Sequence, residues 1–110
     1  MNFKEYQIRA HNTSLNTKVG DSTVVYPILG LTNESGEVAG KLKKLFRDKN
    51  GVVDQEFKDM MTCELGDVLW YLAESCTQMG IELSDIAESN ILKLESRKAR
   101  DVIKGSGDNR

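Results

Sequence analysis

The chain of 110 residues contains 39% hydrophobic and 29% charged residues and has a formal net charge of −2. This balance excludes a disordered or membrane-embedded chain, because apolar residues are plentiful yet never form a run of about 18. The 15 basic against 17 acidic residues argue against a nucleic acid polymer or a membrane as partner. We expect a single domain over residues 1–110. Basic residues gather at 41–49 and 93–104, where they can face a small polyanion such as a nucleotide phosphate.

The first residues and the cysteines indicate the compartment. The N-terminal residues lack the basic-then-apolar layout of a signal peptide. Cys63 and Cys76 fall in one predicted helix about 20 Å apart, too far for a disulfide between them. We expect both to be small buried side chains with free thiols, and the protein to be cytoplasmic.

The first predicted helix runs from Asn2 to about Leu15. Asn2 is a suitable N-cap, with Glu5 three residues later completing a capping box. His11 is the only histidine, and we expect it on the helix surface or lining a groove. A turn-rich loop over residues 16–26 follows.

The second predicted helix has Pro27 in its first turn and ends at residues 48–51. Its apolar stripe recurs at spacings of three and four, at Ile28, Leu31, Val38, Leu42 and Leu45. At 100° per residue, Glu34, Glu37, Lys41 and Lys44 lie at the border of this stripe. Acids at such a border can reach a cleft without full burial.

The third predicted helix begins near Asp54 and continues to Met79. Its stripe comprises Phe57, Met61, Val68, Leu72 and Met79. Glu64 falls within about 60° of the centre of that stripe, and Asp67 falls at its margin. A carboxylate there breaks the binary pattern, as functional residues often do.

The fourth predicted helix is capped by Ser84. We expect its buried side to consist of Ala87, Ile91, Leu94 and Val102. On an adjacent face lie Asn90, Lys93 and Arg97. Residues 105–110 are too polar and glycine-rich to continue the helix, and no segment has strand alternation. The fold is therefore predicted to be all-α.

Two acid pairs suggest the chemistry. Glu34 and Glu37 share one helix face, as do Glu64 and Asp67 on the next helix. Such oxygen-rich clusters suit Mg²⁺. A solvated helix face is the alternative for the first pair alone, but both pairs together favour a metal site.

Other residues supply what a nucleotide substrate requires. Phosphates can be held by cations, which are Lys41, Lys44, Lys93 and Arg97. Asn90 can hydrogen-bond a sugar or base, and Trp70 or Tyr71 can stack on a base. Lys41 alternatively pairs with Glu37 one turn away, and Trp70 alternatively anchors a subunit interface. Together these residues indicate hydrolysis of a nucleoside triphosphate.

The sequence lacks the motifs of three other kinds of active site. No Glu-x-x-His pair is present for a di-iron site, and no phosphate-binding P-loop occurs. No serine or cysteine has an obvious histidine partner for nucleophilic catalysis.

The acid pairs and their surroundings resemble those of MazG-like nucleotide pyrophosphohydrolases, members of the all-α NTP pyrophosphatase superfamily. The similarity extends over most of the chain from Pro27 onward. It rests on residues 30–38 and 64–71, on Asn90-x-x-Lys93-Leu94-x-x-Arg97, and on the ending at 105–110. Asn33 departs from the pattern, because many relatives carry an acid there, and this puts the affinity for a second metal in doubt.

The resemblance implies a four-helix MazG-like bundle assembled as an intertwined homodimer or homotetramer. It also implies cleavage of (d)NTPs to (d)NMPs and pyrophosphate with Mg²⁺, or alternatively Mn²⁺, in the removal of non-standard nucleotides. Glu37, Glu64 and Asp67 would hold the metal, and Glu34 would either share it or orient the attacking water. The alternatives are a non-catalytic helical nucleotide-binding or interaction module and a phosphoribosyl-ATP pyrophosphohydrolase.

Overall fold

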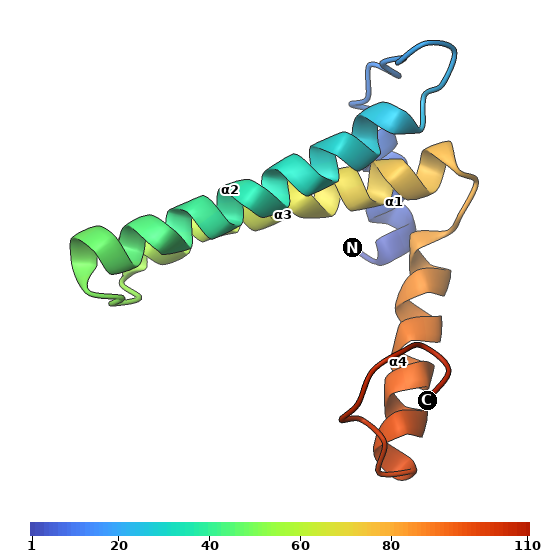
Figure 1. The fold of residues 1–110 in the computed structure, drawn as a ribbon. Coiled ribbons are helices and arrows are strands. Elements are labelled where there is room, and N and C mark those ends of the chain that lie inside the picture. The colour runs from blue at the N-terminus through green and yellow to red at the C-terminus, as the bar shows by residue number, and fades with distance from the viewer.

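A computed structural model describes residues 1–110. The chain is all-helical, with four helices: α1 (Phe3–His11), α2 (Val25–Lys49), α3 (Gln55–Gln78) and α4 (Leu83–Ala99). The long helices α2 and α3 lie side by side as a hairpin, α1 crosses one end of it, and α4 points away (Figure 1). The all-α prediction is confirmed. No helix is both long and apolar enough to cross a membrane.

Local capping chemistry accounts for several helix ends. The Asn2 side chain and Glu5 form the expected capping box of α1. Asp54 accepts a hydrogen bond from the Phe57 N–H at 2.9 Å and caps α3 as predicted. Helix α2 begins two residues before Pro27, which still lies in its first turn, and ends where Asn50 adopts a left-handed conformation.

Two predicted helix boundaries are wrong. Helix α1 ends at His11, not near Leu15, because the Thr13 hydroxyl donates to the Ala10 carbonyl at 2.7 Å and turns the chain away. Ser84 does not cap α4, whose N-cap is Glu82.

The free N–H at the start of α4 is instead satisfied by Gln7 of α1. This buried side chain accepts from the Leu83 N–H at 2.8 Å and donates to the Ile81 carbonyl at 2.8 Å. One glutamine thereby ties α1 to the connection between α3 and α4. The direction of α4 depends on this long-range contact, which a local capping rule does not contain.

The core of the chain is small and lies where α1 meets α3 and the start of α4. It consists of Ala10, Ala73, Cys76 and Leu83, with Tyr6, Trp70 and Leu72 packed around it. Cys76 is buried, whereas Cys63 is exposed. The expectation of a buried side chain is thus wrong for Cys63, although both thiols are free as predicted.

The predicted buried side of α4 is only partly buried, because Ala87 and Val102 are half-buried whereas Ile91 and Leu94 are exposed. Ile91 is 53% and Leu94 is 37% accessible, because α4 leaves the hairpin after its first turn, which packs on α1 and α3. Ile28 and Leu42 of the predicted α2 stripe are exposed too. The four helices therefore do not close into a bundle within one chain.

Candidate metal and nucleotide site

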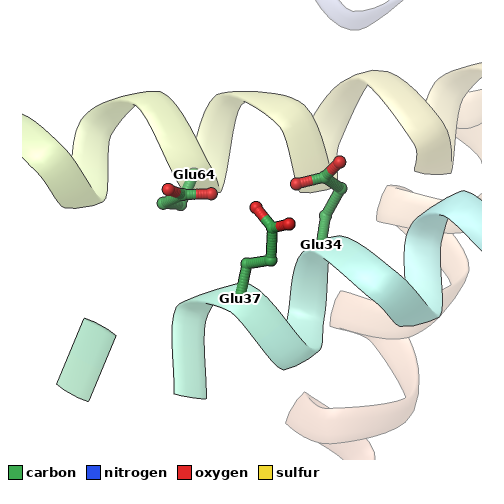
Figure 2. Close-up of side chains that lie close together, drawn as sticks. All are labelled: Glu34, Glu37 and Glu64. Carbon is green, nitrogen blue, oxygen red and sulfur yellow. The ribbon is translucent and has the colours of Figure 1, made fainter. Parts of the chain in front are cut away.

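Three of the four predicted acids converge in the middle of the hairpin. Glu34 and Glu37 of α2 point toward Glu64 of α3 (Figure 2), and one carboxylate oxygen from each lies within 4.8 Å of the others. Asp67 is exposed and falls outside this group. The helix spacing predicted which faces meet, and the packing of α2 on α3 brings the carboxylates together.

The cluster is electrostatically strained. Partial burial of the carboxyl, followed by the negative charges of Glu37, Asp67 and Glu64, raises the pKa of Glu34 above its ordinary value. Asp67 is therefore close enough to act on Glu34 although it is not in the tightest group. A divalent cation among these oxygens would relieve the repulsion, and an all-oxygen donor set suits Mg²⁺.

Lys41 partly neutralises the cluster. Its Nζ atom lies 3.7 Å from a carboxylate oxygen of Glu64, across the hairpin. The alternative pairing with Glu37 on the same helix is not formed. Lys41 and Lys44 also line a wide polar hollow of about 530 Å³ along α2, together with Asn33 and Glu37.

The predicted aromatic residues lie beyond the acids along α3. Trp70 donates from its indole Nε1 to the Thr13 hydroxyl at 2.8 Å, and its ring meets Tyr71 edge-on at a centroid distance of 4.9 Å. Both rings line a cavity of about 180 Å³ between the loop that follows α1 and the end of α3. A void of about 150 Å³ is enough to hold a benzene-sized ring.

Tyr71 links the cavity to the acid cluster. Hydrogen bonding with the Tyr26 side chain, then burial, then the nearby charges of Glu34 and Asp67 raise the pKa of Tyr71 to about 12. The phenol therefore stays protonated at neutral pH. It is a hydrogen-bond donor at the boundary between the two parts of the site.

Sequence reasoning missed a polar network on the cavity wall. The buried Glu74 accepts from the Gln78 amide at 2.7 Å and lies 3.1 Å from His11 Nδ1. The same Gln78 amide also donates to Asn16 Oδ1 at 2.8 Å. A signal for this network was present in the sequence, because the polar spacing that begins at residues 64 and 67 continues through 71, 74 and 78 on one face of α3.

The predicted cations of α4 lie apart from the acid cluster. Asn90 is exposed, and Lys93 and Arg97 lie farther along a helix that points away from the hairpin (Figure 1). Arg97 is buried and Lys93 is half-exposed, and both contact Asp108 of the C-terminal tail. One chain thus holds the acids and the α4 cations in separate places.

Comparison with known proteins shows the family of the chain. The sequence profile of the MazG nucleotide pyrophosphohydrolase domain matches residues 26–101. The chain belongs to this family. The MazG match starts at the beginning of α2 and includes both acid pairs and the α4 cations.

A relative of similar length extends the comparison beyond the MazG profile. The Gene 37 protein of Mycobacterium phage L5 is 47% identical over 109 residues, covering 96% of each chain. Its name states no activity. No solved structure matches the chain.

Proposed function

We propose that this MazG domain is a Mg²⁺-dependent nucleoside triphosphate pyrophosphohydrolase that converts (d)NTPs to (d)NMPs and pyrophosphate. The observation that carries the proposal is the convergence of Glu34, Glu37 and Glu64 within one MazG domain. Removal of non-standard nucleotides in the cytoplasm is the cellular role that we infer for such an activity.

Glu37 and Glu64 of the tight group would hold the metal together with Asp67, which lies three residues beyond Glu64 on α3, and Glu34 is an alternative fourth ligand. Mg²⁺ is the expected ion and Mn²⁺ the alternative. When bound, such an ion offsets phosphate charge and makes a coordinated water more acidic. Their oxygen atoms match this hard cation, and the lack of histidine in the cluster disfavours softer metals.

Glu34 would orient the attacking water and accept its proton. Its carboxylate lies beside those of Glu37 and Glu64, comes from the preceding turn of α2, and is close enough to Tyr71 for its charge to help raise the pKa of that phenol. A carboxylate that remains outside the metal's immediate coordination can act as a general base. Lys41 would exchange its contact with Glu64 for a substrate phosphate once a metal neutralises the acids, and Lys44 lies one turn away for a second phosphate.

The cavity beside Trp70 and Tyr71 is our candidate for the base of the nucleotide. Its first lining residue on α3 is Trp70, three residues beyond Asp67, which is about 4.5 Å of helix rise. Aromatic walls favour a flat ring, and the Gln78 amide is held in a fixed orientation that suits it to read polar groups on a base edge.

A second subunit would supply Asn90, Lys93 and Arg97. The chain exposes 7897 Å², whereas a compact monomer of 12.3 kDa exposes about 6,100 Å². The difference of about 1,800 Å² exceeds the roughly 800 Å² per partner of a standard interface. A homodimer or homotetramer that packs α4 of one chain against another would bury this excess and bring the cations toward the acids.

Release of pyrophosphate from a panel of NTPs and dNTPs with Mg²⁺ tests the proposal. We expect Glu64→Gln to lower turnover at least about 100-fold, because loss of even an outer residue of a metal site costs 10- to 100-fold. Glu56→Gln, an exposed acid near the start of α3 and outside the acid cluster, is the matched control and should leave turnover unchanged. Absence of cleavage across the panel, or a fully active Glu64→Gln variant, would refute the proposal.

A further inference from the structure

The C-terminal tail, residues 102–110, folds back beside α4 instead of extending from it (Figure 1). The Arg110 guanidinium donates to the carbonyl oxygens of Val102 and Ile103 at 3.1 Å and of Gly107 at 2.6 Å, which closes the tail on itself. Arg100 of the α4 C-cap donates to the Arg110 carbonyl oxygen at 3.0 Å. The tail is therefore a small closed loop fastened to the end of α4.

Arg97 lies under this loop and is only 4% exposed. Its Nη2 donates to the Asp108 carbonyl oxygen at 3.0 Å, and it lies 3.4 Å from both the Gly107 carbonyl oxygen and Asp108 Oδ1. Its Nε is buried and has no hydrogen-bond partner. A buried donor without a partner is costly, and a guanidinium has five N–H groups to satisfy. The tail thus fills the position without using all the donors that Arg97 offers.

Asp108 supplies the only anion at this position. Its Oδ1 lies 3.5 Å from Lys93 Nζ and 3.4 Å from Arg97 Nη2. Strong charge-assisted hydrogen bonds measure about 2.7–2.9 Å, so these contacts are long. The Asp108 side chain is 87% exposed and therefore easily removed. A phosphate group, with three oxygens and more charge, matches Lys93 and the open Arg97 donors better than this carboxylate does.

We propose that Asp108 acts as an internal competitor: the tail covers the Lys93–Arg97 anion site in the free protein, and a polyphosphate displaces it. The exchange is non-covalent, with one anion replacing another on the same two cations. The identity of this polyphosphate, as the phosphate chain of the nucleotide or the pyrophosphate product, rests on the proposed function. The tail would then be released when the substrate binds, and it would stay released while the product remains bound.

Titration calorimetry with inorganic pyrophosphate in EDTA measures the competition without metal or turnover. We expect Asp108→Asn to bind pyrophosphate about three- to fivefold more tightly than wild type, because an exposed ion pair contributes up to about 1 kcal/mol. Asp101→Asn is the matched control: it removes the same charge from an exposed residue next to the tail, and its φ of 56° suits asparagine. Equal affinities for the two variants, or no pyrophosphate binding to any of the three proteins, would overturn the proposal.

Nuclear magnetic resonance of the wild-type backbone amides gives a second readout. On addition of pyrophosphate we expect the Gly105 and Gly107 signals to move toward the narrow, random-coil positions of a released tail. Binding of pyrophosphate with unmoved tail signals would also overturn the proposal. A protein without pyrophosphohydrolase activity can still show both tail-displacement results, and an active protein can lack them. The two experiments therefore distinguish failure of this proposal from failure of the proposed function.

Discussion

At the scale of single residues, the acid cluster holds three carboxylates close enough together to repel one another. Glu34 and Glu64 are partly buried and Glu37 is exposed, so the group is neither a solvated surface nor a closed core. Lys41 alone offsets part of the charge. Such a cluster is expected to destabilise the metal-free fold, because like charges within a few ångströms disfavour full ionisation.

Replacement of Glu34 by Gln should raise the melting temperature of the metal-free protein at pH 7.5. The pKa of Glu34 is raised above its ordinary value of 4.5 in the fold, so the folded state binds this proton more tightly than the unfolded chain does. The free energy of unfolding therefore falls as the pH rises from 4.5 to the raised pKa of Glu34. At pH values above that raised pKa, the stability contributed by this proton is completely lost. Calorimetry in EDTA between pH 4 and pH 8 measures the effect.

The gain from Glu34→Gln should shrink as the pH falls below the ordinary pKa, where wild-type Glu34 is itself protonated. Glu95→Gln, an exposed acid on α4, is the control and should show no such pH-dependent gain. A gain of the same size at pH 4 and pH 8 would contradict the electrostatic explanation.

At the scale of elements, the contact between α2 and α3 determines whether the acids meet. Gly30 lies one turn before Glu34, directly against the Tyr71 ring. Any Cβ atom at position 30 would overlap the Cε1, Cδ1 and Cζ atoms of that ring. The glycine thus permits the close approach of the two helices beside the site.

Gly30→Ala should lower the free energy of unfolding by about 1–3 kcal/mol, the usual cost of forcing extra volume into a packed contact. Urea denaturation monitored by circular dichroism measures this change. Gly40→Ala, on the same helix with no atom within 4 Å of the added Cβ, should instead raise the free energy of unfolding by up to about 1 kcal/mol, because alanine is the better helix former. Equal effects at both positions would rule out the Tyr71 contact as the cause.

At the scale of the whole molecule, the chain has more surface than a compact monomer. Only 11 of 110 residues are buried, and the Cα radius of gyration is 16.9 Å, against about 13 Å for a compact domain of this length. Helix α4 is the clearest contributor, with Ile91 and Leu92 more than half exposed on an arm that points away from the hairpin. These values favour self-association through α4.

Sedimentation equilibrium should therefore detect a dimer or tetramer. Ile91→Lys should weaken its association at least tenfold, because burial of an isoleucine contributes about 1.5–3 kcal/mol. Val19→Lys introduces the same charge at a similarly exposed residue of the loop between α1 and α2 and should have little effect. A wild-type protein that stays monomeric at high concentration would contradict the shared site.

Features that depend on neighbouring residues were predictable from the sequence. The 3.6-residue period identified four helices, side-chain caps marked Asn2 and Asp54, and i,i+3 spacing paired the acids, because each signal lies within a turn or two of helix. The family resemblance rested on the same short motifs. For that reason the grouping of the Glu34, Glu37 and Glu64 carboxylates on facing helices was predictable.

Contacts between residues more than a few helical turns apart became known only from the tertiary structure. Gln7 replaces Ser84 at the start of α4 and ties it to α1, and His11 contacts Glu74, 63 residues later in the chain. Asp108 covers Arg97, 11 residues earlier, because the tail folds back. None of these pairs follows from local periodicity, because a polar side chain finds its partner through packing and not through spacing. Whether α4 closes over its own hairpin or extends from it is likewise decided by long-range contacts.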